Sequence, residues 1–272
     1  MKTLENQTLL YDDDCPLCQV YTAGFINTGM LDANGRKPFA KLTEIEYGFV
    51  DIKRAANEIA LVDRKNNTVI YGIDSLLKII GNSFPWIEKL GHLKVFNYFL
   101  RKLYSFVSYN RKVIIPNKTD EKTLQCIPDF SYKYRLLYVI FAANFTAIIL
   151  FYYSEMIGVL PKGNFIREWV LAFGQILFQI AFLVRHSRKT VLNYVGHLLT
   201  VSLLGSLLLL AIILCNQLES LPQFVILGWF GCCILLMFAE HYRRIQLLKL
   251  PFYLCYTWIL YSVIAILFIL TF

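Results

Sequence analysis

The chain has 272 residues, of which 57% are hydrophobic, and a formal net charge of +8. Its mean hydropathy of +0.50 argues against an ordinary soluble protein, in which about 45–50% of residues are apolar. Charge is concentrated in the first half, because residues 1–135 hold 19 of the 27 Lys and Arg residues and 15 of the 19 Asp and Glu residues. We therefore expect two domains, a soluble one over residues 1–130 and an apolar one over residues 131–272.

The first expected elements are a strand and a helix. The short apolar run "TLLY" at residues 8–11 is typical of a buried strand. A helix is expected over residues 16–28, because Pro16 suits a first helical turn and Asp14 is a good N-cap. The strand therefore leads into the helix through the four residues "DDDC".

A hairpin and two helices are expected next. Residues 58–72 contain two β-rich runs around "RKNN", which predict a hairpin, and residues 73–82 predict a short helix. Residues 85–112 predict one longer amphipathic helix with basic residues beside its apolar face, which we expect to pack on the domain with partial contact to a membrane. The apolar face comprises Trp86, Leu90, Leu93, Leu100, Leu103 and Val107. These elements are compatible with an α/β domain of thioredoxin-like layout.

The second half contains five segments long enough to cross a bilayer, which requires about 20 mostly apolar residues. They are roughly residues 134–153, 166–184, 191–214, 221–239 and 252–271. We therefore expect an all-α membrane domain of five transmembrane helices.

The loops between these segments predict an orientation. The 185–190 and 240–251 loops each contain three Lys or Arg residues, whereas the 154–165 loop contains one and the 215–220 loop none. Positively charged loops stay on the cytoplasmic side, so we expect the N-terminal domain inside and the C-terminus outside. The basic residues lie beside apolar segments, so we expect them to meet anionic lipid, and we expect no nucleic-acid partner.

The Cys-x-x-Cys pair formed by Cys15 and Cys18 predicts redox chemistry. A helix N-terminus stabilises a thiolate through its backbone N–H groups and its dipole, so we expect an exposed Cys15 to attack a disulfide. Cys18, one turn later, would resolve the mixed disulfide, and Asp12 would assist it or order the turn. Such an enzyme needs no bound cofactor. Its partners would be a disulfide-bearing protein or small thiol substrate and a cellular thiol reductant.

Two other site chemistries fit parts of the same stretch. A structural zinc ion needs four ligands, and the soluble half offers Cys15, Cys18, His92 and Cys126. Only the first two of these ligands are closely spaced in the sequence, whereas zinc sites usually combine two such pairs. Asp12 and Asp14 follow a strand, as in haloacid-dehalogenase-type phosphotransferases. Those enzymes also need magnesium and a later acidic pair, and the soluble half has no Asp-Asp and no Gly-Asp-x-x-x-Asp after the motif.

The apolar half adds cysteines and polar residues of its own. Either the cysteines relay reducing equivalents across the membrane or they serve as small apolar residues, and we favour the second role. They are Cys215, Cys232, Cys233 and Cys255. The polar residues could line a cavity, but we favour hydrogen bonds between helices. They are Asn144, Gln175, Gln179 and His197.

The stretch "YDDDCPLC" resembles the DCC family, thiol-disulfide oxidoreductases named for an Asp-x-x-Cys-x-x-Cys motif. The resemblance covers residues 8–130 and implies a thioredoxin-like fold and disulfide chemistry. Its matching residues are Asp12, Cys15, Cys18, Gly72, Asn110, Arg111, Cys126 and Pro128. We therefore expect a membrane-anchored thiol-disulfide oxidoreductase. The alternative is a non-catalytic or transport-related membrane protein with a structural or regulatory soluble domain.

Overall fold

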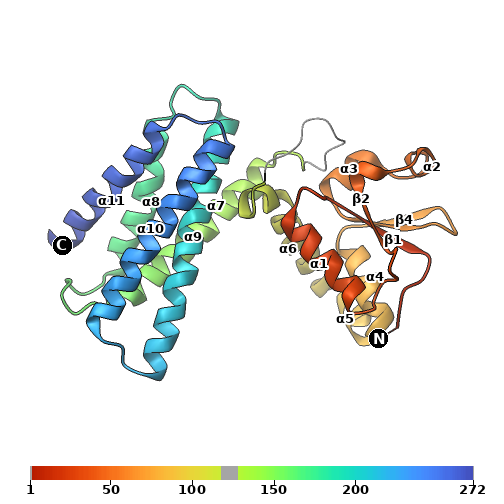
Figure 1. Cartoon of the computed structure of the whole chain (residues 1–272), viewed down its shortest axis with the longest axis horizontal. Helices are drawn as coiled ribbons and strands as arrows, with labels where there is room; N and C mark the ends of the chain where they lie inside the picture. The colour runs from red at the N-terminus through yellow and green to blue at the C-terminus, as the bar shows by residue number, and fades with distance from the viewer. Residues whose placement is uncertain (1, 118–127, 272) are drawn as a thin grey trace. The chain divides into compact units, whose positions relative to one another are not determined.

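The computed structural model describes residues 2–117 and 128–271 of the chain (Figure 1). The chain divides into two units, Met1–Tyr134 and Arg135–Phe272. The first unit combines strands and helices, and the second is helical.

A four-stranded mixed sheet forms the centre of the first unit. Its strands are β1 (Gln7–Tyr11), β2 (Arg36–Pro38), β3 (Ala60–Asp63) and β4 (Thr68–Tyr71). They lie in the order β2-β1-β3-β4, with β1 parallel to β2 and the other two neighbouring pairs antiparallel. A parallel pair needs a crossover, which α1 (Pro16–Asn27) provides between β1 and β2. The expected strand, helix and hairpin are confirmed, and Asn67 adopts the positive φ of 51° that the hairpin turn requires.

Helices cover both faces of this sheet. Successive strand residues point to opposite faces, so Leu9 belongs to one buried cluster with Leu61 and Leu10 belongs to another with Val62. In Figure 1, α1 and α3 lie on opposite sides of the sheet. The remaining elements are η1 (Phe39–Lys41), α2 (Glu44–Tyr47), α3 (Ile52–Asn57), α4 (Ile73–Ser83), α5 (Pro85–Gly91) and α6 (Lys94–Ile114).

The prediction of a single long helix over residues 85–112 is wrong, because the chain forms α5 and α6 with a break after Gly91. Gly91 is buried so close to α4 that a Cβ atom on it would lie 2.5 Å from Leu77. The carbonyl oxygen of Gly91 accepts a hydrogen bond from the Asn97 side chain at 2.9 Å, and Leu93 adopts an extended conformation. Close packing against α4 and this side-chain bond therefore end the first helix.

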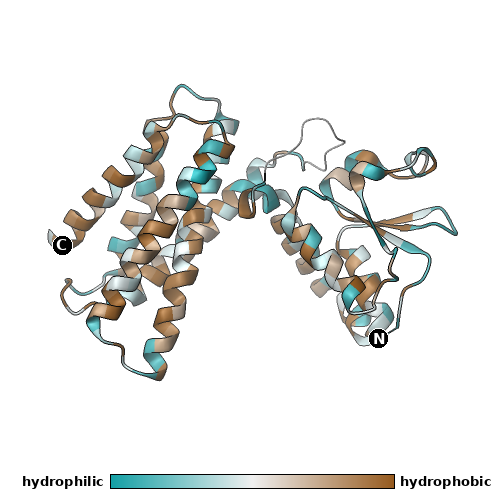
Figure 2. Cartoon of the chain, in the orientation of Figure 1, coloured by the Kyte–Doolittle hydropathy of each residue, from teal (hydrophilic) through white to brown (hydrophobic). Residues whose placement is uncertain are grey.

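The second unit consists mainly of long apolar helices, which appear brown in Figure 2. They are α7 (Tyr132–Ser154), α8 (Phe165–Ala181), α9 (Arg188–Leu218), α10 (Gln223–Leu247) and α11 (Tyr253–Thr271). Among the described residues, α7, α9, α10 and α11 are long and apolar enough to cross a membrane. The fifth expected span falls on α8, which has only 17 residues and carries a buried Arg167–Glu168 ion pair in its first turn. Four of the five expected spans are thus found as candidates, and a span at α8 stays a prediction.

Small residues and hydrogen bonds join these helices. A Cβ atom on Gly205 would lie 2.2 Å from Met237, so α9 and α10 approach closely there. The Thr257 hydroxyl donates to Gln179 Oε1 at 2.9 Å, and Arg244 contacts His197 Nδ1 at 3.1 Å. These bonds agree with the expected role of Gln179 and His197 in helix packing. Asn144 instead donates to the Ile140 carbonyl oxygen of its own helix at 2.7 Å, and Gln175 lines a cavity of about 160 Å³.

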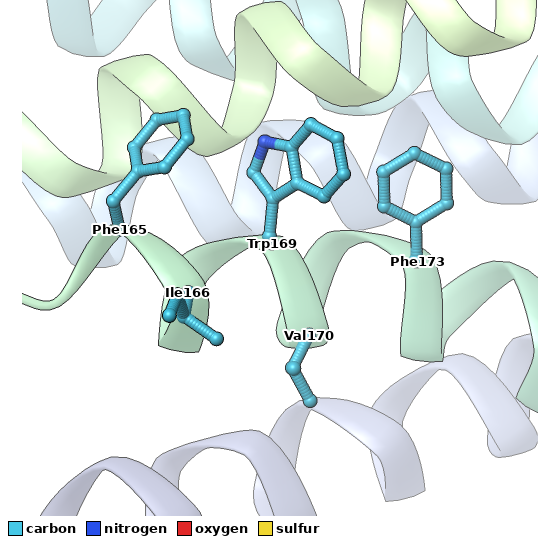
Figure 3. Close-up of a pocket in the computed structure, with 5 residues that line it drawn as sticks. All are labelled: Phe165, Ile166, Trp169, Val170 and Phe173. Atoms are coloured by element: carbon cyan, nitrogen blue, oxygen red, sulfur yellow. The ribbon is translucent and has the colours of Figure 1, made fainter.

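Aromatic and aliphatic side chains line an open hollow of about 480 Å³ on α8. Figure 3 shows Phe165, Trp169 and Phe173 on one side of this helix, and Ile166 and Val170 projecting elsewhere. Ile166 is 71% exposed and Val170 is 53% exposed. The hollow has no polar lining and no titratable group, so it is an apolar helix surface rather than a reaction site.

Replacing Leu61 by Ala should strongly destabilise the first unit. Leu61 has no exposed surface, and removing a buried Leu side chain costs about 2–5 kcal/mol. Pulse proteolysis of the full-length protein in detergent and urea measures this loss. Ile45→Ala is the control, because Ile45 is 77% exposed and its loss should change stability by less than about 0.5 kcal/mol. Equal losses for the two variants would contradict the sheet-centred core.

Candidate functional site

The cysteine pair lies where β1 passes into α1. The carbonyl oxygen of Asp12 accepts the backbone N–H of Cys15 at 3.2 Å, and the Asp12 carboxylate accepts the backbone N–H of Asp14 at 3.1 Å. These bonds fix a tight turn before the helix. Asp14 was expected to be the N-cap, but Cys15 occupies that position and makes no side-chain capping bond. The Asp14 prediction fails because Asp12 orders the turn instead.

The two thiols of the pair are hydrogen-bonded to each other, and their acidities differ. The bond from Cys18 is the largest cause that lowers the pKa of Cys15 to about 6, and the Cys18 backbone N–H and the charge of Arg111 contribute further. Burial and the Asp12 carboxylate act in the opposite direction. The same bond, together with burial, raises the pKa of Cys18. The pair therefore favours a Cys15 thiolate that accepts a hydrogen bond from the Cys18 thiol.

Two cations from the end of α6 reach this turn. Lys112 Nζ lies 2.9 Å from Asp12 Oδ2, and Arg111 Nη2 lies 3.6 Å from the same oxygen. Asp12 is only 3% exposed, so its charge is balanced within the protein. Arg111 also donates to the Ala56 carbonyl oxygen at 3.1 Å, which holds its guanidinium in place. Asp12 thus interacts with Arg111 and Lys112 in addition to ordering the turn.

Two tyrosines lie near Cys18. Tyr21, three residues further along α1, is hydrogen-bonded to Cys18, and burial raises the pKa of Tyr21. The Tyr104 hydroxyl on α6 accepts the backbone N–H of Ile59 at 2.8 Å, and burial raises its pKa to about 12. Both hydroxyls therefore remain protonated at neutral pH. Sequence reasoning assigned no role to Tyr21, although its spacing from Cys18 places both on one helix face.

Cys15 is buried, which corrects the expectation of an exposed nucleophile. It has no exposed surface, and Cys18 is 4% exposed. The segment after α6 lies against the helix start, because the Asn117 side chain donates to the Asp14 carbonyl oxygen at 3.3 Å. This contact joins residues more than a hundred positions apart, so the local pattern at Cys15 could not reveal it. A substrate reaches the sulfur only after the surrounding structure opens.

The geometry does not favour the two other chemistries at this site. Within residues 2–117 and 128–271, no three His, Cys, Asp or Glu residues cluster to hold a metal ion. His92 does not group with Cys15 and Cys18, and Cys126 lies outside the described residues. Phosphotransfer would need a free Asp12 carboxylate beside a second acidic residue. The Asp12 carboxylate instead pairs with Lys112 and accepts the backbone N–H of Asp14.

The cysteines of the second unit are free thiols in different environments. Cys215 and Cys232 are exposed, and Cys233 and Cys255 are buried. None of them forms a disulfide with another described cysteine, so a relay through them remains a hypothesis.

No family model, curated protein or solved structure matches the chain. The resemblance to the DCC family therefore depends on the motif residues alone. Of these residues, the structure brings Asp12, Cys15, Cys18 and Arg111 together. Gly72 lies apart from the cysteine turn and adopts a φ of 65° before α4.

Substitutions of the residues near Cys15 should shift the pKa of its thiol in opposite directions. We expect a wild-type midpoint of about pH 6. Cys18→Ala should raise it most, towards the ordinary thiol value of about 8.5, Arg111→Gln should raise it less, and Asp12→Asn should lower it. The measurement is the ultraviolet thiolate absorbance of each protein minus that of the matching Cys15→Ser variant.

Asp13→Asn is the matched control for this series, because Asp13 is exposed and does not contribute to the Cys15 shift. Its midpoint should equal that of the wild type. A wild-type midpoint near the ordinary value, or equal shifts for Asp12→Asn and Asp13→Asn, would contradict the arrangement described here.

Proposed function

We propose that the chain is a membrane-anchored thiol-disulfide oxidoreductase with a thioredoxin-like first unit. The observation that carries the proposal is the position of Cys15 at the start of α1, with Cys18 one helical turn later and Arg111 beside the same turn. The pKa of Cys15, lowered to about 6 by Cys18 and by the charge of Arg111, agrees with this position. The parallel β1-α1-β2 unit, followed by antiparallel β3 and β4 and then α4, supports the fold assignment. The DCC resemblance of the motif adds to both.

In the proposed reaction the Cys15 thiolate attacks one sulfur of a substrate disulfide. A mixed disulfide forms, and the other substrate sulfur leaves as a thiolate that takes up a proton. Cys18 then loses its proton and attacks the Cys15 sulfur, which closes the Cys15–Cys18 disulfide and releases the second substrate thiol. Two electrons pass to the substrate, and a cellular thiol reductant restores the pair by the same exchange. No bound cofactor takes part.

The hydrogen bond between the thiols explains the order of these steps. Before attack, the Cys18 thiol donates a hydrogen bond to the Cys15 thiolate, and this bond is the largest cause of the raised Cys18 pKa. Formation of the mixed disulfide removes the negative charge from Cys15. That cause then disappears, so the Cys18 pKa falls at the step where a thiolate is needed. The charge of Arg111, which favours both thiolates, remains.

The burial of both sulfurs favours the alternative, a non-catalytic membrane protein with a structural cysteine pair. Under the oxidoreductase proposal, the helix start must open for a substrate disulfide, and the Asn117 contact with Asp14 is one bond that must break. Under the alternative, the pair remains a stable dithiol.

The membrane part of the proposal extends the four candidate spans to five. We include α8, because exposed apolar side chains line its outer surface and it packs beside α9 and α11. With five spans, the basic 185–190 and 240–251 loops fall on the cytoplasmic side together with the first unit. The cysteine pair then lies in the reducing compartment, where a thiol reductant is available.

The redox test asks whether Cys15 and Cys18 behave as one couple. The full-length protein is equilibrated in buffers of defined thiol–disulfide ratio, and the alkylation of Cys15 and Cys18 is measured on their peptide. Both thiols should become resistant to alkylation at the same ratio, as a two-electron couple. Cys15→Ser should lose disulfide reductase activity to the background rate. Cys18→Ser should keep the first attack and accumulate a mixed disulfide.

Cys232→Ser is the control for this test, because Cys232 is an exposed cysteine of the second unit. It should leave both the couple and the activity unchanged. A pair that stays reduced at every ratio, with equal activity in wild type and Cys15→Ser, would establish the non-catalytic alternative.

The topology test asks whether α8 crosses the membrane. Lys162→Cys and Ser187→Cys lie at exposed positions on either side of α8. Cys215→Ser with Cys232→Ser removes the exposed native thiols of the described residues, and Cys126→Ser removes the thiol that lies outside them. In intact cells, an impermeant maleimide should label Lys162→Cys and leave Ser187→Cys unlabelled until the cells are opened. Labelling of both positions from the same side would show that α8 does not span.

A further inference from the structure

Seven large apolar side chains are exposed along α5 and the first half of α6. We call this set the α5–α6 face, and its members are Trp86, Leu90, Leu93, Val95, Tyr98, Phe99 and Leu103. Trp86 is 65% exposed, Val95 is 86% exposed and Phe99 is 60% exposed. Large apolar surfaces of this kind are rare on soluble proteins unless a partner covers them.

The opposite side of α6 explains why these residues face outward. Successive helix residues are rotated by about 100°, so Tyr104, Ser108 and Arg111 lie on the side away from Val95 and Phe99. That side packs on the sheet, where Tyr104 bonds the backbone of Ile59 and the Ser108 hydroxyl donates to the Asn57 carbonyl oxygen at 2.6 Å. This side of α6 thus faces the interior of the unit, whereas Val95, Tyr98 and Phe99 remain exposed.

The charge beside the α5–α6 face is mainly positive, with Glu88 on α5 as its one acidic residue. Residues 89–117 contain six Lys and Arg residues and no Asp or Glu. Arg101 pairs with Asp74, and Arg111 and Lys112 pair with Asp12. The other three are the exposed Lys89, Lys94 and Lys102.

We propose that the α5–α6 face lies on the surface of an anionic lipid bilayer. Exposed Trp, Tyr and Phe side chains combined with Lys are typical of helices that lie in the membrane interface. A second copy of this chain fits less well, because a symmetric contact would bring the same lysines together. An anionic bilayer offers both an apolar interior for the aromatic residues and negative charge for the lysines.

The chain itself keeps a bilayer within reach of this face. α6 ends at Ile114, and the candidate span α7 begins at Tyr132. An extended chain covers at most about 3.5 Å per residue, so the connection is no longer than about 60 Å. Such a tether gives the surface a high effective concentration near the bilayer. The proposal does not depend on the redox activity of Cys15.

Tryptophan quenching by brominated lipids tests the proposal in the full-length protein. The protein is placed in nanodiscs of brominated phosphatidylcholine, with or without phosphatidylserine. One reporter is Trp86. Its emission is the emission of the wild type minus that of the Trp86→Phe variant, so that the contributions of the three tryptophans of the second unit cancel. A second is Phe99→Trp in the Trp86→Phe background, and the control is Ile45→Trp in that background, on the exposed surface of α2.

In anionic nanodiscs, both reporters on the α5–α6 face should lose roughly half of their emission, because interfacial helices bury their apolar face by about 5–10 Å. Ile45→Trp should stay unquenched. Lys94→Gln combined with Lys102→Gln should reduce the quenching to the level seen without phosphatidylserine. Both lysines are exposed, so the double variant should remain folded.

Three results would overturn the proposal. Unquenched reporters in both lipids, including a case in which the protein dimerises through this face, would exclude a bilayer as the occupant. Equal quenching of Ile45→Trp would show that contact is not specific to the face. Full quenching in the double lysine variant would show that anionic lipid is not recognised.

Discussion

The ion pairs between Asp12 and the end of α6 connect the parts of the first unit on which the cysteine site depends. Asp12 lies at the end of β1, orders the turn into α1 and meets Arg111 and Lys112 across about a hundred residues of chain. A buried carboxylate without cations would be strongly unfavourable, so the strand end and the helix end are held together. The cations also offset the effect of Asp12 on Cys15, since Arg111 lowers the Cys15 pKa that Asp12 raises.

The sequence predicted those features of the first unit that depend on neighbouring residues. The strand before the cysteines, the helix after Pro16 and the hairpin around "RKNN" all follow from local pattern and turn chemistry. The break at Gly91 and the burial of Cys15 involve contacts with residues further along the chain, with Leu77 and Asn117 as examples. Periodicity within one segment carries no information about such contacts, so these features could not be predicted.

The same distinction applies to the second unit and to the site. Hydropathy predicted the four candidate spans, whereas α8 has only 17 residues because it ends at Ala181. At the site, the motif identified Asp12, Cys15 and Cys18. Lys112 and Tyr104 were missed because α6 brings them to the turn from elsewhere in the chain. The apolar pattern of residues 85–112 was visible in the sequence, but only the fold reveals which residues of it face outward.

The complete burial of Cys15 also affects the chemical lifetime of its thiol. A thiolate is ordinarily vulnerable to peroxide and other small oxidants in proportion to its ionised fraction and its accessibility. With no exposed surface at Cys15, oxidants gain access only during local opening of the fold. Resistance to oxidative damage is therefore governed by the stability of the surrounding turn, and it can be high even for an acidic thiol.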